Sequence, residues 1–253
     1  MAAGHAHALY VSRPSLLHRL PAQCKIAAVV VFVLVVVSTP TRAFWAFGAY
    51  AVLLLAVVLT ARLSPLLVVR RMVVEVPFLL FALLLPVVTG GERVDVLGLS
   101  LSESGLLGAF NILAKGSLGV AASIVLASTT TIRDLLHGLD RLHLPRQLVL
   151  IASFMVRYAD VLSAEMGRMK VARESRGFAA TGLRAWPVLS KSLGALFLRS
   201  YERGERVHLA MRSRGFNGTM PVLRRQPTRP GQWATAFALP AAAGVVAVAA
   251  VVA

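Results

Sequence analysis

The chain has a single cysteine and few acidic residues, and these two shortages set the first limits on its function. One cysteine, Cys24, cannot form a disulfide within the chain or a cysteine-based metal cluster. We expect it to be a small buried residue near the start of a helix. Asp and Glu number 11 against 27 Lys and Arg, a formal net charge of +16. Such an excess indicates either Lys and Arg retained on the cytoplasmic side of a membrane, or binding to nucleic acid or anionic lipid.

Motifs of ATP hydrolysis and of hydrolytic catalysis are also missing. The sequence contains no G-x-x-x-x-G-K-[ST], no H-E-x-x-H and no G-x-S-x-G. Without a P-loop the chain cannot hydrolyse ATP by that route, so any ATP-driven work must come from a partner. Ser, His and Asp are scattered without a pattern that would support a nucleophile, which makes an intramembrane enzyme the weaker hypothesis.

Apolar residues, in contrast, are abundant. They make up 57% of the 253 residues, and the mean hydropathy is +0.72, whereas soluble domains contain about 45–50% apolar residues. Runs of about 20 apolar residues are long enough to cross a bilayer as helices. We predict an all-α polytopic membrane protein with about five transmembrane helices, at residues 26–41, 43–61, 72–91, 104–132 and 230–253.

Two of these spans contain ionisable residues, which are costly inside a membrane. The third holds Glu75 together with Pro77 and Pro86, a combination that predicts a kinked helix or a segment packed within protein. Since Glu75 lies four residues after Arg71, we expect an ion pair between them. Lys115, in the fourth span, could extend toward the interface or line a subunit contact.

Loop charges predict the orientation of the chain in the cell membrane. The lead-in and the loop between the second and third spans carry three basic residues each, at Arg13, Arg19 and Lys25 and at Arg62, Arg70 and Arg71. The first loop has only Arg42, and the loop between the third and fourth spans is net negative. By the positive-inside rule the N-terminus lies inside and, after five spans, the C-terminus lies outside.

The segment 131–229 differs from the rest of the chain. It holds 18 Lys and Arg and 7 Asp and Glu, so 11 of the 16 net positive charges lie there. We therefore divide the chain into N-terminal transmembrane helices (1–130), a cytoplasmic region (131–229) and a C-terminal transmembrane helix (230–253). Three- and four-residue apolar spacing in the cytoplasmic region predicts amphipathic helices at 131–143, from Pro145 to Gly177, and up to Gly215. We expect each to be too charged to span.

The two longer helices end in an eleven-residue repeat. The first copy runs from Arg168 to Phe178 and the second from Arg206 to Phe216; six of eleven positions match, including Ser-Arg-Gly-Phe. Arg in the last turn suits the negative end of the helix dipole and offers donors to carboxylates of another protein. Gly permits a sharp helix end, Ala keeps the tip thin, and Phe can enter an apolar pocket. The candidate docking residues are Ala172, Ser175, Arg176, Gly177, Phe178, Ala210, Ser213, Arg214, Gly215 and Phe216.

One such end would be ordinary capping chemistry, but its repetition favours a partner with two equivalent sites. The repeat, with Gly138–Pro145, Met155–Tyr158, Arg199–Glu205, Gly4–Tyr10 and Leu16–Leu20, resembles the transmembrane T component of energy-coupling factor (ECF) transporters, most closely the cobalt-type branch called CbiQ. In that family two coupling helices seat in grooves of a pair of ABC-type ATPases, and the essential arginines fall on Arg176 and Arg214 here. Ser175 and Ser213 stand where the family often has Ala, and we expect docking to survive.

The resemblance implies a non-catalytic subunit that transmits ATPase closure to a membrane-embedded, metal-type substrate-binding S component. It also implies contact with membrane lipids and leaves room for a small accessory membrane subunit. Cobalt is the expected substrate, with nickel or a vitamin as the alternative. Since the S component holds the substrate, neither a cofactor nor a metal site is expected here. His5 and His7 alone would make a weak site.

A basic membrane-anchored platform for anionic lipid or nucleic acid is the alternative from another class. Tyr158, Trp186 and Tyr201 are the main large aromatics of the basic region, which is few for stacking on bases. Its basic residues also alternate with apolar ones instead of forming a run. We therefore expect no nucleic-acid partner and only a secondary attraction to anionic headgroups.

Overall fold

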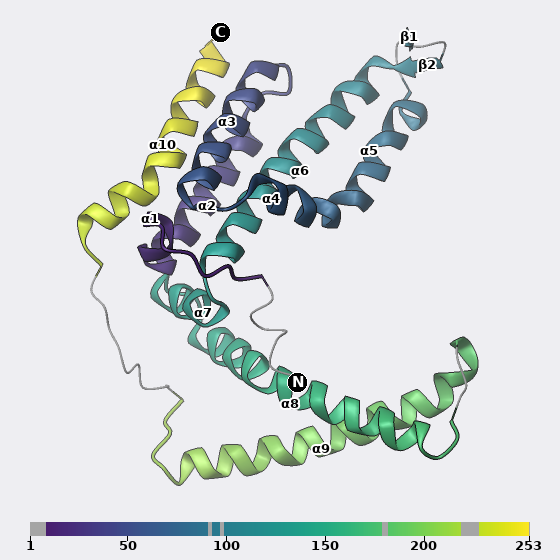
Figure 1. Cartoon of the computed structure of the whole chain (residues 1–253). Helices are drawn as coiled ribbons and strands as arrows, with labels where there is room; N and C mark the ends of the chain where they lie inside the picture. The colour runs from purple at the N-terminus through teal and green to yellow at the C-terminus, as the bar shows by residue number, and fades with distance from the viewer. Residues whose placement is uncertain (1–8, 91–92, 97–98, 179–181, 219–227, 253) are drawn as a thin grey trace. The chain divides into compact units, whose positions relative to one another are not determined.

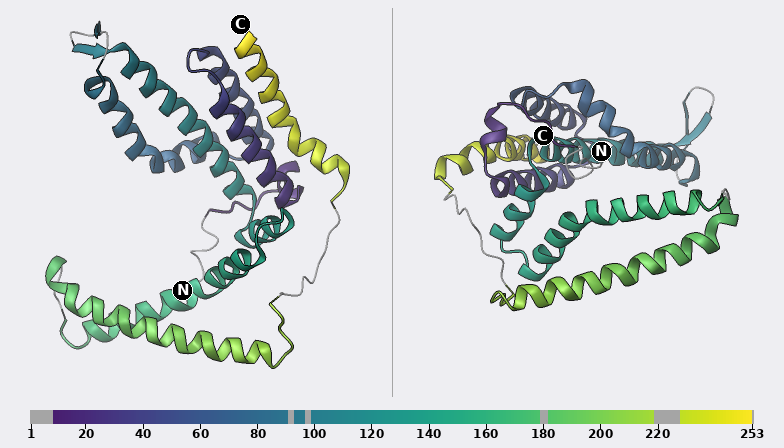
Figure 2. Two further views of the ribbon diagram at one scale, coloured as in Figure 1. Left: turned by 180° about the vertical axis from the view of Figure 1, so that it is seen from behind. Right: turned by 60° about the horizontal axis from the view of Figure 1, so that its bottom comes forward.

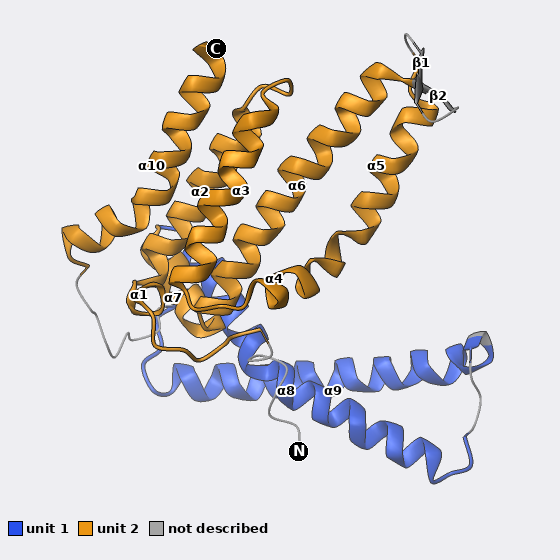
Figure 3. Cartoon of the chain, turned by 45° about the horizontal axis from the view of Figure 1, so that its top comes forward, with its two compact units in different colours: residues 1–8, 143–226 blue, residues 9–142, 227–253 orange. Residues whose placement is uncertain are grey.

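The computed structural model is almost entirely helical and describes residues 9–90, 93–96, 99–178, 182–218 and 228–252 (Figure 1). This confirms the all-α prediction. One feature was not expected: between the third and fourth apolar runs, β1 (Arg93–Val96) pairs antiparallel with β2 (Leu99–Ser102). The chain forms two compact units, one built from residues 9–142 and 227–253 and the other containing residues 143–226 (Figure 3).

The first unit contains most of the apolar helices. Its elements are α1 (Leu16–Arg19), α2 (Ala22–Ser38), α3 (Phe44–Thr60), α4 (Pro65–Arg71), the 3₁₀ helix η2 (Met72–Glu75), α5 (Val76–Val88), α6 (Glu103–Thr129), α7 (Ile132–Arg141) and α10 (Pro230–Val252). In its core α2 packs against α6, α7 and α10, and α5 packs against α6. Phe32 and Tyr50 are fully buried at the centre, and Cys24 is buried in the first turn of α2, as predicted.

Length and apolar composition qualify four helical stretches among the described residues to cross a membrane: Pro65–Val88, Glu103–Thr129, Arg146–Glu174 and Pro230–Val252. The helices α2 and α3 are apolar but have only 17 residues each, the lower end of the range for a span. The stretch Arg146–Glu174 was predicted to be too charged to span. On composition that prediction is wrong, because its charges gather toward the C-terminal end and leave a long apolar stretch before them.

The third span is interrupted, as its glutamate and prolines predicted. The helix α4 gives way to the 3₁₀ turn η2, and Pro77 occupies the first turn of α5. The predicted ion pair between Arg71 and Glu75 is wrong. Arg71 turns to the carbonyl of Leu9 and the hydroxyl of Ser128, each at 2.7 Å, and a carboxylate oxygen of Glu75 accepts a hydrogen bond of 2.6 Å from Ser117.

Lys115 has a partner within the chain. Its ammonium donates to the carbonyl of Val37 at 2.7 Å, in the last turn of α2. A cation is favourable at that end because the unsatisfied carbonyls of a helix C-terminus carry partial negative charge. An interhelical cap therefore accounts for this lysine without a second protein.

The fourth apolar run, predicted as one helix to residue 132, ends three residues earlier. Thr130 is extended at φ −136° and ψ 130°, and Thr131 caps a new helix, α7, by accepting the amide of Asp134 at 3.2 Å. Threonine hydroxyls compete with the helix for backbone groups and favour such N-caps. The separate amphipathic helix predicted at 131–143 is confirmed as α7, and the break before it lies at Thr130.

The second unit is a pair of long helices, α8 (Arg146–Glu174) and α9 (Trp186–Arg212), joined through the 3₁₀ helix η3 (Gly182–Ala185). Arg173 donates to Ser192 at 3.0 Å and Arg199 to Glu165 at 2.7 Å, so the two helices run antiparallel (Figure 2). The predicted helices in this region, from Pro145 onward and up to the two glycines, are confirmed.

Candidate functional site

The first copy of the repeat caps the C-terminal end of α8. Gly177 adopts φ 78°, in the left-handed region that favours glycine. The amide of Gly177 donates to Glu174 at 3.0 Å, and the amide of Phe178 donates to Arg173 at 3.2 Å. These two bonds define a Schellman motif, which satisfies carbonyls that the helix would otherwise leave free.

The second copy repeats this geometry bond for bond. Gly215 has φ 81°, its amide donates to Arg212 at 3.0 Å, and the amide of Phe216 donates to Met211 at 3.0 Å. The sequence repeat is therefore a structural repeat, and both Ser-Arg-Gly-Phe segments have the same path.

The serines of the repeat are satisfied within their own helices. Ser175 donates its hydroxyl to the carbonyl of Ala172 at 3.1 Å, and Ser213 donates to Ala210 at 3.0 Å. The hydroxyl of each serine therefore already has an acceptor within its own helix. Both alanines are exposed on their helix surfaces, which keeps the tips narrow.

Arg176 and Arg214 have side chains that are free to contact another molecule. Both are exposed, and within the described part of the chain neither forms an ion pair or a side-chain hydrogen bond. Arg173, three residues before the first, is instead held by Ser192. The guanidinium groups of Arg176 and Arg214 therefore remain available for an acceptor on another molecule.

The two tips lie at opposite ends of the α8–α9 pair, because each tip ends its own helix and the helices are antiparallel (Figure 2). At about 1.5 Å per residue, the 27 residues of α9 span roughly 40 Å. A partner that engages both tips must present two sites separated by a distance of this order.

Glu165 fastens the two helices where they cross. Its carboxylate contacts Arg168 of the same helix and Arg199 of α9, and its side chain is only 18% exposed. Hydrogen bonds from Arg168 and then from Arg199 hold the pKa of this carboxyl below its ordinary value. Glu165 was not among the predicted site residues. Its i,i+3 spacing to Arg168 was a visible signal, but the contact with Arg199 depends on tertiary structure.

No ligand cluster emerges around these helices. Among the described residues, no three His, Cys, Asp or Glu side chains come together as a metal site would require. His5 and His7, the histidines considered above, lie outside the described residues.

Comparison with known proteins gives consistent matches. A family model named CbiQ, described as cobalt transport protein, matches residues 13–226. The energy-coupling factor transporter transmembrane protein EcfT of Listeria innocua is 28% identical over 224 residues, 83% of each chain. The cobalt transport protein CbiQ of Rhodobacter capsulatus is 30% identical over 130 residues, 51% of this chain and 53% of its own. The nickel permease LarQ of Lactiplantibacillus plantarum is 32% identical over 106 residues, 40% of this chain and 38% of its own.

Proposed function

The chain belongs to the CbiQ family of cobalt transport proteins, and from that premise we propose that it is the T component of an ECF importer for cobalt. In this role it carries no catalysis of its own. It transmits the conformational change of two ABC-type ATPases to a membrane-embedded S component that binds the metal. The observation that carries the proposal is the pair of identical Schellman-capped helix ends with unpaired arginines at Arg176 and Arg214.

The geometry of the tips supports a two-site partner. Each tip offers a free guanidinium, a thin alanine surface one turn back and an aromatic side chain just beyond the cap. The docking set is accordingly Ala172 to Phe178 and Ala210 to Phe216. Tips roughly 40 Å apart suit two ATPase subunits, each with one groove, better than one small partner. When the ATPases close on ATP, the grooves approach and load is placed on both helices.

The topology that goes with this role places the N-terminus and the region 131–229 in the cytoplasm and the C-terminus outside. It keeps α8 on the cytoplasmic side although that helix is long and apolar enough to span. Cytoplasmic tips are required because ATP and the ATPases are there. The density of basic residues in 131–229 supports this side. A cysteine-accessibility experiment at the two ends of the chain would check it.

Cobalt is proposed over nickel or a vitamin because the family model that matches residues 13–226 is described as cobalt transport protein. A relative named as a nickel permease leaves nickel as the nearest alternative. Uptake of radioactive cobalt and nickel by cells that express the complete transporter decides between them. Uptake of nickel without uptake of cobalt would contradict the cobalt proposal.

The double variant Arg176→Glu, Arg214→Glu tests the docking role directly. It reverses both charges without touching the cap bonds, which are made by the backbone. The matched control is Arg146→Glu, Lys191→Glu, which changes the net charge equally at two exposed positions of the same helices, outside both Ser-Arg-Gly-Phe segments. We expect the tip variant to lose co-purification with the ATPases and the control to retain it. Equal retention by both variants would refute docking through the tips.

A further inference from the structure

The C-terminus of α6 is buried although it is made of polar residues. Ser128, Thr129 and Thr130 are 0%, 2% and 5% exposed. A helix end leaves its last four carbonyls without partners in the helix, and burying such groups unpaired is costly. The next residues turn directly into α7 without a glycine. This junction therefore needs partners from elsewhere in the chain.

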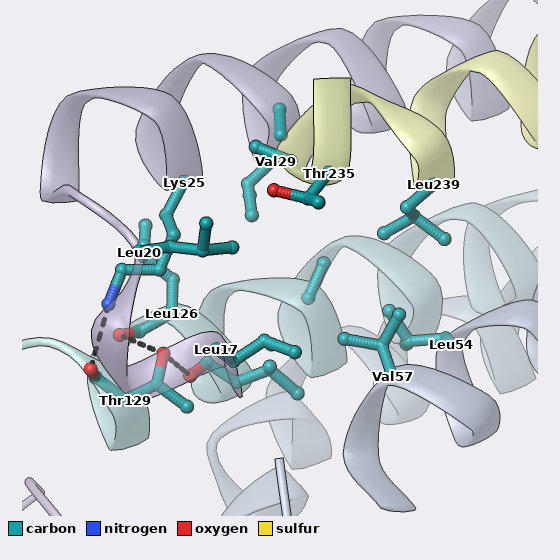
Figure 4. A pocket seen from close by; sticks show the side chains of 14 residues that line it. Leu17, Leu20, Lys25, Val29, Leu54, Val57, Leu126, Thr129, Thr235 and Leu239 are labelled. Atoms are coloured by element: carbon teal, nitrogen blue, oxygen red, sulfur yellow. Dashed lines mark hydrogen bonds between the residues drawn. The ribbon is translucent and has the colours of Figure 1, made fainter. Parts of the chain in front are cut away.

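Those partners come from two segments distant in sequence. The amide of Val11, in the N-terminal segment, donates to the carbonyl of Ser128 at 3.0 Å. The ammonium of Lys25, in the first turn of α2, donates to the carbonyl of Thr129 at 2.8 Å, as Figure 4 shows. A lysine at this end also opposes the negative pole of the helix. Lys25 is itself 7% exposed and lies at the edge of a small apolar crevice of about 90 Å³.

A third segment joins them through Arg71 at the end of α4. One of its nitrogens donates both to the hydroxyl of Ser128 and to the carbonyl of Leu9. Arg71 thus ties the N-terminal segment to the end of α6, beside the bond from Val11. Charge-assisted hydrogen bonds of this kind are stronger than those between neutral groups.

The helix that follows the junction is also held closely. Gly138 of α7 lies against the first turn of α2, where an added Cβ would come within 2.9 Å of the backbone nitrogen of Gln23. From α7 the chain continues through Leu142 and His143 into α8. His143 has a φ of 62°, an unusual value for a residue with a Cβ.

We propose that Lys25 and Arg71 are positioning residues for energy coupling, which lock the α6–α7 junction to the membrane-spanning helices. The inference rests on the proposed function. Load applied to α8 reaches α6 along the chain through α7. A locked junction passes that load to α2, α4 and α6 together. A loose junction would bend at Thr130 and absorb it.

Hydrogen exchange on the purified chain tests the lock without any partner. We expect Lys25→Met, Arg71→Met to raise the exchange rate of the Val11 amide about tenfold, since the segments on either side of its bond to the Ser128 carbonyl lose their ties. Lys25 no longer bonds the carbonyl of Thr129, and Arg71 no longer joins Leu9 to the hydroxyl of Ser128. Arg70→Met is the matched control, because Arg70 is exposed and adjacent to Arg71. Equal exchange in variant, control and wild type would overturn the lock.

The complete transporter tests its consequence. We expect the double variant to hydrolyse several-fold more ATP per cobalt ion taken up, while it still co-purifies with the ATPases. Lys25→Arg, Arg71→Lys should restore most of the coupling because the positive charges remain. An unchanged ratio of ATP to cobalt, or a parallel loss of both with the amount of assembled complex, would overturn the positioning role. The proposed docking role fails by a different result, which is that the Arg176→Glu, Arg214→Glu variant still assembles with the ATPases.

Discussion

The glycines at the two tips give the sharpest prediction, because their replacement isolates a single physical effect. A Cβ added at Gly177 or Gly215 would meet no heavy atom within 4 Å. Alanine therefore introduces no clash with a neighbouring group, and its cost is confined to the backbone. With φ of 78° and 81°, that cost is about 1–2 kcal/mol for each residue.

This cost should appear in docking. In Gly177→Ala, Gly215→Ala the free tips relax out of the left-handed conformation, and binding must restore it. We expect the affinity for the ATPases to fall about five- to thirtyfold per tip, since about 1.4 kcal/mol is a factor of ten. The effects of the two tips should add because they are far apart. Asparagine, which tolerates the left-handed region better, should cost less than alanine.

Titration of the ATPases against the chain in lipid nanodiscs measures these affinities. The control is Gly167→Ala, Gly194→Ala, at two glycines inside α8 and α9 that also have open space around them. Each of these alanines should stabilise its helix by about 0.5–1 kcal/mol, and the affinity for the ATPases should not fall. If the tip alanines bound as tightly as wild type, the fixed direction of the caps would have no part in recognition.

Two further predictions concern the fold. The depressed pKa of Glu165 means that its stabilisation of the α8–α9 pair is present above the ordinary pKa of 4.5 and lost as the pH falls through the lower folded value. Glu165→Gln should destabilise the pair at neutral pH and remove that acid dependence in thermal unfolding monitored by circular dichroism. Gly138→Ala should cost about 1–3 kcal/mol, because its Cβ would overlap the backbone at Gln23. The control is Gly119→Ala, where an added Cβ would meet no heavy atom within 4 Å, so the unfolding temperature should not fall. Equal unfolding temperatures for the two variants would contradict the overlap at Gly138.

Much of the helical region could be predicted from local pattern alone. The apolar stripe, Pro145 and Gly177 defined α8 and placed its end within a few residues, because capping depends on neighbours along the chain. The same reasoning failed for the pair Arg71 and Glu75. Their i,i+4 spacing favoured an ion pair, but the 3₁₀ turn at Met72–Glu75 rotates one away from the other, and distant partners were available to both.

The lysines of the apolar helices show the same limit. Lys25, in the first turn of α2, and Lys115, within α6, have no neighbour along the chain that reveals what they bind. Their acceptors, Thr129 and Val37, lie 104 and 78 residues away. Each lysine meets the carbonyl end of the other's helix because α2 and α6 pack antiparallel, a relation that no local pattern encodes.

The sequence by itself determined that the chain is helical and apolar, that its charge gathers in one region, and that two helices end in the same Ser-Arg-Gly-Phe segment. These properties follow from composition, spacing and capping chemistry, which act over a few residues. Tertiary structure decided that the two tips lie at opposite ends of one antiparallel pair and that Glu165 of α8 pairs with Arg199 of α9. It also decided that Lys25 and Arg71 donate hydrogen bonds to the C-terminal end of α6. Each of these depends on groups brought together across tens of residues, where only the packing of the helices sets the distance.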